Sequence, residues 1–202
     1  MHTFYHKRNM QDPLIVNGTR VFRPWEYTVL RSYLKPDQQI VADTLLLTGM
    51  RYEELLRFRH NPNWLDEDSA TVHLPSWAMQ KGRKLSRNVQ TERWVRLSIR
   101  GKGVVPNLFR VEMPRRVAFD QMLKRKALKA SISREDFIAD NISQKTFRKT
   151  LASWLRIYYP SALDRIFLSL GHSRITELRQ YLGIPFSDRD KQEMREWVEG
   201  WI

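Results

Sequence analysis

Strong cations recur at helical spacing in two places along this sequence. Arg51 stands three residues before Glu54, and Lys145 stands three residues before Arg148. Residues three apart project from the same side of one helical turn, so each pair should act together. An Arg–Glu pair of this kind is usually a weak surface ion pair, but two guanidiniums and an ammonium that converge on one point need an anion between them. Arginine binds phosphate in bidentate fashion, so these residues would suit phosphate chemistry.

A third segment contributes a histidine and a tyrosine. His172 lies in the run Leu170-Gly171-His172-Ser173, and Tyr181 follows nine residues after His172. Taken alone, such a histidine is more often a structural residue near a helix start, and such a tyrosine is more often a core or surface aromatic residue. Only together with the cation pairs do they indicate a site.

The basic charge of the chain is concentrated in one third of its length. The net charge is +13, and residues 81–149 hold 19 basic and 6 acidic residues, interleaved with aromatic side chains. Basic surfaces bind nucleic acid strongly and salt-dependently, because neutralising phosphates releases counterions. A merely solubilising surface is the alternative, and the segregation of the charge favours nucleic acid over it.

The composition excludes several classes of protein. Because there is no cysteine, a disulfide scaffold, a thiolate zinc site, an iron–sulfur cluster and a cysteine nucleophile are excluded. No apolar run approaches the ~20 residues of a membrane span, and residues 1–10 are polar rather than signal-like. The five histidines are scattered, so no metal site is expected. We therefore expect an ordered, soluble, intracellular protein.

A mainly helical domain with a small antiparallel sheet (an α+β fold) is the organisation that the hydrophobic pattern predicts. Helices are expected over residues 23–34, 38–47, 51–59, from 114 onward, 145–159, 163–170, 173–182 and 187–201. Strands are expected over residues 64–66, 71–74 and 93–97. Within this scheme Pro36 should end the first helix, and Asp37 should cap the second. Ser187 with Asp190 resembles a capping box for the last helix.

Taken together, the segments resemble the catalytic domain of the tyrosine recombinases, the phage-integrase family. The first box of that family, Leu-x-Thr-Gly-x-Arg-x-x-Glu-Leu, is matched over residues 46–55. The second box, in which lysine sometimes replaces the first histidine, corresponds to residues 145–150. The third corresponds to residues 170–173 with Tyr181, and the family's Arg-x-Val-x-Leu strand corresponds to residues 93–97. The order and spacing of the boxes agree over roughly residues 22–201.

The resemblance implies a mechanism of DNA strand transfer. Tyr181 would attack the scissile phosphate, forming a 3′-phosphotyrosyl bond and freeing a 5′-hydroxyl. Arg51 and Arg148 would clamp the non-bridging oxygens, with His172 as an additional donor, and Glu54 would orient Arg51. The bond energy is kept in the covalent intermediate, so neither ATP nor a metal nor another cofactor is implied.

Two positions depart from the family pattern or leave it ambiguous. Lys145 stands where histidine is commoner; it loses a group that titrates near neutral pH but keeps a cationic phosphate donor, so it is expected to be catalytic. The hairpin lysine that would protonate the leaving 5′-oxygen is Lys81 or Lys84, with Lys81 preferred. Either lysine could instead contact the DNA backbone.

Double-stranded DNA is the implied partner, held largely through phosphate contacts. The residues expected to make those contacts are Lys84, Arg87, Arg115, Arg116 and Lys124. The resemblance further implies a homo-oligomer, tetrameric at the synapse and monomeric or dimeric when unbound. No membrane association is expected, and the location would be the cytoplasm, at the nucleoid of a prokaryotic or viral host.

Residues 1–22 are expected to be a tail, or a strand-like piece that ends at Val21-Phe22, ahead of a catalytic domain over residues 23–202. No separate core-binding domain is expected, so the chain would be a catalytic domain or a minimal recombinase. Trp197 and Trp201 share an apolar stripe of the last helix, which could pack in cis or dock on a neighbouring protomer; docking is slightly favoured.

Three other activities are consistent with the same boxes. A type IB topoisomerase and a telomere resolvase share the tyrosine nucleophile and the arginines. A DNA-binding relative could keep the fold and lose catalysis. Because all the boxes are filled, we favour an active site-specific DNA recombinase or integrase.

Overall fold

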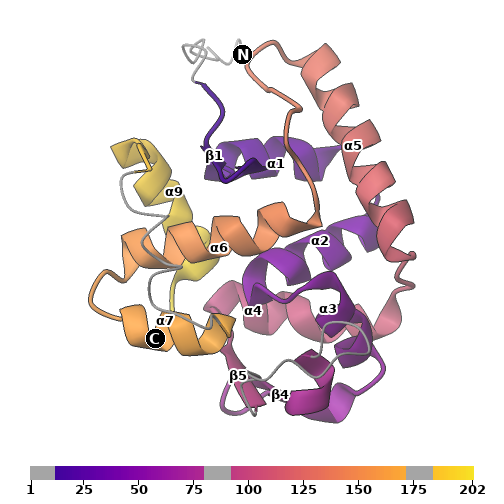
Figure 1. Cartoon of the computed structure of the whole chain (residues 1–202), viewed down its shortest axis with the longest axis vertical. Coiled ribbons are helices and arrows are strands. Elements are labelled where there is room, and N and C mark those ends of the chain that lie inside the picture. Colours follow the sequence, from indigo (N-terminus) through magenta and orange to yellow (C-terminus); the bar gives the residue numbers. More distant parts are fainter. Residues whose placement is uncertain (1–11, 80–91, 172–183) are drawn as a thin grey trace, which may run out of the picture.

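Helices pack around a buried apolar core in this protein, and a small sheet lies at one end (Figure 1). The computed structural model describes residues 12–79, 92–171 and 184–202. The described helices are α1 (Pro24–Ser32), α2 (Pro36–Thr48), α3 (Tyr52–Arg59), α4 (Ile99–Val104), α5 (Arg116–Ser133), α6 (Gln144–Tyr158), α7 (Leu163–Leu170) and α9 (Asp188–Val198). The short 3-10 helices are η1 (Pro62–Trp64), η2 (Ser76–Met79) and η3 (Val105–Arg110). The predicted fold class is confirmed.

The helix α6 crosses the middle of the molecule and packs against α2, α7 and α9 (Figure 1). Its buried face carries Phe147, Leu151, Trp154 and Leu155, at the spacing of one helical stripe. A strongly amphipathic helix in this central place is fixed from several sides. It therefore gives Arg148, which lies between two of these buried residues in the sequence, a rigid support.

The segment before α1 packs on the core. The strands β1 (Ile15–Val16) and β2 (Thr19–Arg20) form a hairpin, and Val21 and Phe22 are fully buried. The backbone N–H of Phe22 donates to Thr150 Oγ1 of α6 at 3.0 Å. Strands are present in this segment, the second ending at Arg20 rather than at Val21-Phe22, and the described part of the segment is joined to the core by hydrogen bonds and apolar contacts.

The predicted small sheet is present, with the order β3-β4-β5 and antiparallel pairing. Its strands are β3 (Leu65–Asp66), β4 (Thr71–Pro75) and β5 (Glu92–Arg96). Along β5 the side chains alternate, so that Trp94 is exposed while Arg93 and Val95 are buried. The alternation places an arginine on the inner face of the sheet, where an apolar residue is usual.

The start of α2 differs from the expectation. Lys35 is the N-cap, Pro36 opens the helix, and the side chain of Gln38 accepts from the Lys35 N–H at 3.0 Å. Asp37 is therefore a first-turn residue rather than the cap, and α1 has already ended at Ser32. The physical reason is that proline suits the first turn of a helix, where its missing N–H has no intrahelical partner to lose.

Two helical pieces between the sheet and α5 were not predicted. The helix α4 begins after Ser98, whose Oγ accepts from the Gly101 N–H at 3.2 Å, and η3 continues it. Glycine in a helix costs about 1 kcal/mol relative to alanine, so the two glycines of α4 hide the helical pattern. Packing against α2 and α9 supplies the stability that local propensity lacks.

The last helix packs within its own chain. Trp197 and Trp201 are both buried, and the ring centroid of Trp197 lies 5.1 Å from that of Tyr27 in α1. The expectation that these tryptophans dock on a neighbouring protomer is therefore wrong, because their surface is already covered by this chain. The capping box is confirmed: Ser187 Oγ accepts from the Asp190 N–H at 3.1 Å, and Asp190 accepts from the Ser187 N–H at 2.9 Å.

The helix expected over residues 173–182 lies outside the described residues. Among the helices of residues 12–79, 92–171 and 184–202, none is both long enough and apolar enough to cross a lipid bilayer.

Candidate active site

Arg51 is held at the turn between α2 and α3. It is the N-cap residue of α3, and Glu54 reaches back to it as in a capping box. Glu54 Oε2 accepts from the Arg51 backbone N–H at 2.8 Å, and Glu54 Oε1 accepts from Arg51 Nη1 at 2.5 Å. The pairing that the three-residue spacing predicts is present, with a backbone hydrogen bond in addition.

The turn itself depends on Gly49. Its φ is +60°, in the left-handed region that ends many helices. A Cβ at this position would lie 2.5 Å from Leu170 Cδ2 and 3.1 Å from Leu151 Cδ2. Both the backbone conformation and the close approach of α6 and α7 therefore require glycine two residues before Arg51.

Arg148 joins this turn from α6. Its Nη1 donates to the Gly49 carbonyl at 3.0 Å, and its Nη2 donates to the Leu170 carbonyl. Its hydrogen-bond acceptors thus come from the end of α2 and from the end of α7. The sequence predicts Arg51 and Arg148 for one site, and the structure places them on either side of the same turn.

A third arginine, which begins the Arg-x-Val-x-Leu strand motif but was not among the predicted site residues, completes the cluster. Arg93 of β5 is buried; its Nη2 donates to Glu54 Oε2 at 2.8 Å, and its Nη1 donates to the Leu170 carbonyl at 2.9 Å. A signal was available in the sequence, because Arg93 is in phase with the apolar residues Val95 and Leu97. We refer below to Arg51, Arg93, Arg148 and Glu54 as the arginine cluster.

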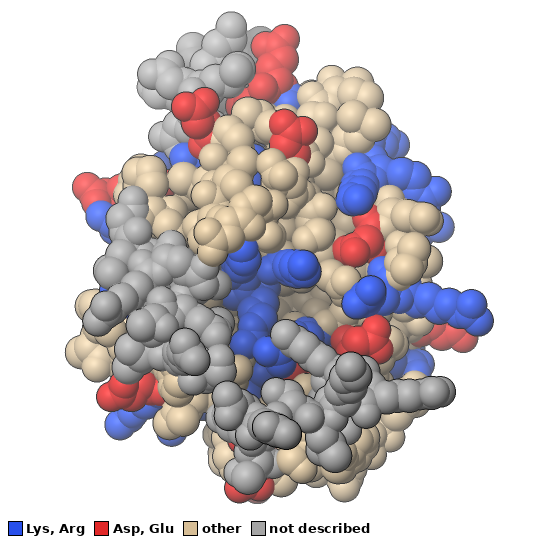
Figure 2. Space-filling view, in the orientation of Figure 1, with Lys and Arg blue, Asp and Glu red and all other residues tan. Residues whose placement is uncertain are grey.

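The arginine cluster is electropositive. Burial raises the pKa of Glu54, but the charges of Arg93, Arg51 and Arg148 outweigh burial and bring this pKa to about 2. Glu54 is therefore ionised at neutral pH, and three guanidiniums surround one carboxylate. The Arg51 side chain is 35% exposed, so the excess positive charge is accessible from solvent. Figure 2 shows Lys and Arg side chains gathered in the middle of one face of the molecule.

Comparison with known proteins relates this chain to a transposon integrase at the level of fold. No family model matches the sequence, and no curated protein does. The structure matches the Tn1549 transposon integrase in complex with transposon right end DNA, with a TM-score of 0.65 over 92% of this chain at 14% sequence identity. It also matches the same integrase in complex with circular intermediate DNA, with a TM-score of 0.64 over 92% of this chain at 15% identity.

The chain has the integrase catalytic-domain fold. It spans 66% and 68% of the two integrase chains, about two thirds of their length. At this level of identity the likeness concerns the fold, and the chemistry must be argued from the residues.

Within the integrase fold, Lys145 lies exposed in the first turn of α6, one helical turn before Arg148. The neighbouring Lys149 has a structural contact, because its Nζ donates to the Val16 carbonyl at 2.6 Å. Burial and the nearby charge of Lys145 lower the pKa of Lys149. Of the two lysines, Lys145 is the one whose side chain is open to a ligand.

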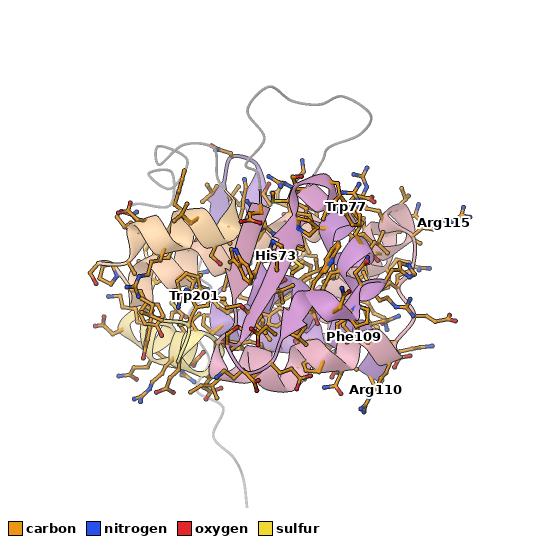
Figure 3. All side chains as sticks on the ribbon, turned by 90° about the horizontal axis from the view of Figure 1, so that it is seen from below. His73, Trp77, Phe109, Arg110, Arg115 and Trp201 are labelled. Carbon is orange, nitrogen blue, oxygen red and sulfur yellow. The ribbon has the colours of Figure 1, made fainter. Side chains whose placement is uncertain are left out.

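The expected DNA-contacting residues of α5 are on the surface. Arg115, Arg116 and Lys124 are exposed, and Figure 3 shows Arg115 at the edge of the molecule. The Tyr52 hydroxyl donates to the Pro114 carbonyl at 2.6 Å, so the start of α5 lies against the start of α3. This contact brings the basic end of α5 beside the turn that carries Arg51.

Five predicted site residues lie outside the described residues: Lys81, Lys84, Arg87, His172 and Tyr181. In the part of the chain that is described, no group of three or more His, Cys, Asp or Glu side chains could hold a metal ion.

Proposed function

We propose that this protein is a site-specific DNA recombinase or integrase, which cleaves and rejoins DNA strands through a 3′-phosphotyrosyl intermediate. The observation that carries the proposal is the arginine cluster, in which Arg51, Arg93 and Arg148 surround the single carboxylate of Glu54. A phosphodiester brings one negative charge and gains a second as it is attacked. Three guanidiniums beside one carboxylate match that development of charge.

In the proposed reaction, Tyr181 Oη attacks the scissile phosphorus. The phenolic proton of Tyr181 leaves to solvent as the Tyr181 O–P bond forms, the bond from phosphorus to the 5′-oxygen breaks, and Lys81 delivers a proton to the leaving oxygen. Arg51 and Arg148 donate to the non-bridging oxygens in the transition state, and His172 adds a further donor. Rejoining is the reverse, with a 5′-hydroxyl attacking the phosphotyrosine.

Two residues complete the proposed chemistry. Lys145 adds a cationic donor one turn from Arg148, and Glu54 keeps Arg51 in its orientation. Lys84 is the alternative to Lys81 as the proton donor. The reaction needs no ATP, because the phosphotyrosine keeps the energy of the cleaved bond.

The proposed DNA path runs from the arginine cluster over the start of α5. Arg115, Arg116 and Lys124 would contact phosphates of the duplex, together with Lys84 and Arg87. Two DNA sites would be brought together by four copies of the chain, with residues 23–202 acting as the catalytic unit. The location would be at the DNA of the host cell, in its cytoplasm.

The test is covalent capture on DNA. We would incubate the protein with a pool of nicked duplexes. The nick prevents cleavage next to it from being reversed, and the sequence around the nick is randomised so that the pool contains many candidate sites. The wild type should form an adduct that resists detergent, and sequencing the captured DNA identifies the preferred site. Tyr181→Phe lacks the nucleophile and should form none.

The outcomes separate the proposal from its rivals. If the wild type binds the pool but forms no adduct, the enzyme proposal fails and a DNA-binding relative remains. With the captured site in hand, strand exchange between two such sites supports a recombinase. Relaxation of supercoiled DNA without exchange would instead indicate a topoisomerase.

A further inference from the structure

Arg93 is a fully buried arginine to which the proposed chemistry gives no role. Burial deprives a guanidinium of its hydration, and replacing a buried ion pair by apolar residues often stabilises a protein. Apolar side chains occupy the neighbouring buried positions: Val95 follows on β5, and Leu74 is paired with Arg93 across the sheet. An apolar side chain would suit this position, so the arginine points to a need for its hydrogen bonds.

Both acceptors of Arg93 also serve the half-exposed arginines of the cluster. Glu54 Oε2 accepts from Arg93, while Glu54 Oε1 accepts from Arg51. The Leu170 carbonyl accepts from Arg93 Nη1 at 2.9 Å and also accepts from Arg148. Arg93 therefore binds the carboxylate that also accepts from Arg51 and the carbonyl that also accepts from Arg148.

This sharing fixes the direction in which the outer guanidiniums point. Glu54 Oε2 is bound by Arg93 and by the Arg51 backbone N–H, so the carboxylate cannot turn and Oε1 stays directed at Arg51 Nη1. Without Arg93, the buried charge of Glu54 would be balanced by Arg51 and Arg148 alone. Attraction in a buried site is strong, so these two side chains would be drawn inward.

We propose that Arg93 is a positioning residue for strand transfer. It balances Glu54 from the inside and holds the Leu170 carbonyl, so that Arg51 and Arg148 present their charge to the scissile phosphate. The inference rests on the proposed function, because it assigns a role within that reaction.

A matched pair of variants tests this role. Arg93→Met removes the buried charge with little change of volume. Arg20→Met does the same at a second buried Arg–Glu pair, in which Arg20 Nη2 lies 2.5 Å from Glu26 Oε1, at a place that shares no residue with the cluster. Each variant is compared with the wild type for unfolding in urea, for DNA affinity and for the rate of adduct formation on the captured site.

Arg93→Met should slow adduct formation about 10- to 100-fold while the DNA affinity changes little. Arg20→Met should lose stability but keep the wild-type rate. Arg93→Lys, which can reach one of the two acceptors, should lie in between. Equal rates for Arg93→Met and the wild type would overturn the inference, as would equal slowing in Arg20→Met.

Two further measurements keep the test decisive. If Arg93→Met does not fold, Arg93→Lys, which keeps the buried charge, replaces it and should still slow adduct formation. In Arg93→Lys, the pKa of Glu54, followed by NMR, should rise above about 2; an unchanged pKa would count against the inference. A wild type that forms no adduct would defeat the proposed function itself. A wild type that forms the adduct, with Arg93 variants that form it at the same rate, would defeat this inference alone.

Discussion

Single residues set the geometry of the arginine cluster, and Gly49 is the simplest to test. Gly49→Ala places a Cβ in a left-handed conformation and against Leu170. Gly18 has a similar φ of +65°, but nothing lies within 4 Å of its added Cβ, so Gly18→Ala is the matched control. The left-handed conformation alone costs about 1–2 kcal/mol, so Gly18→Ala should lose that much in the free energy of unfolding.

Gly49→Ala should lose more than Gly18→Ala in urea unfolding, because Leu170 must also move. Since the Leu170 carbonyl accepts from Arg148, the same change should slow DNA cleavage. Equal destabilisation by the two substitutions would mean that the close packing at Gly49 contributes nothing.

The ionisation of Glu54 gives a prediction with a definite sign. Its pKa in the folded protein, about 2, is below the ordinary value of 4.5, so its stabilising contribution is present above pH 4.5 and is lost as the pH falls toward 2. Glu54→Gln has no such group. The difference in unfolding free energy between the wild type and Glu54→Gln should shrink by about 3 kcal/mol over this range.

Chemical denaturation at a series of pH values measures this difference. Glu92→Gln removes an exposed glutamate and serves as the control. A wild-type advantage over Glu54→Gln that stays constant from pH 6 to pH 2 would show that the surrounding arginines do not depress this pKa.

At this scale the sequence is informative about pairs within one turn and not about distant partners. The Arg51–Glu54 pair follows from a spacing of three. The partners of Arg93 are 39 and 77 residues away, so alternation along β5 can indicate its burial but not what it binds. Arg93 was consequently missed as a member of the site.

Among the elements, α9 closes the core by packing against other helices of the same chain. The Trp197 ring contacts Tyr27, lies 6.1 Å from the Trp154 ring, and is covered by the Arg100 guanidinium at 3.6 Å. Trp197→Ala should therefore lower the free energy of unfolding by about 3–5 kcal/mol. Urea unfolding measures this loss.

The control is Trp94→Ala, because the Trp94 side chain is 51% exposed on the outer face of the sheet. This substitution should cost about 1 kcal/mol or less. If Trp197→Ala left stability unchanged and altered only the oligomeric state, α9 would be an intermolecular contact after all.

The elements that the sequence predicted best are those with long, regular patterns. The apolar stripe of α6 and the alternation of β4 and β5 are local properties, and both were recovered. The docking choice for α9 failed because an apolar stripe shows that a surface is covered but not which molecule covers it. The helix α4 was not predicted from the sequence because packing, rather than local helix propensity, stabilises it.

For the whole molecule, the described part of the basic segment, residues 92–149, contributes Arg93 and Arg148 to the arginine cluster and places Arg116 and Lys124 on the exposed side of α5. If this surface binds DNA phosphates, affinity should fall steeply with salt. Arg116→Gln and Lys124→Gln should each lower the slope of log affinity against log salt by about 0.9. Titrations with a duplex across a salt series measure the slope.

Arg189→Gln and Arg195→Gln are the matched controls. Both arginines are exposed on α9 and pair with glutamates four residues on, at 2.8 and 2.7 Å. They should leave the slope unchanged. A similar loss of slope for all four substitutions would mean that net charge, and not the surface of α5, governs binding.

The most direct measurement is the rate of covalent adduct formation by Arg148→Ala, with DNA affinity followed in parallel. Removing a donor to the transition state should slow adduct formation about 100- to 1,000-fold and leave binding largely intact. Arg134→Ala is the control, because Arg134 pairs with Asp136 in its own loop at 2.8 Å; its rate should match the wild type. If Arg148→Ala formed the adduct at the wild-type rate, or lost it only because it no longer bound DNA, the arginine cluster would not be the catalytic centre.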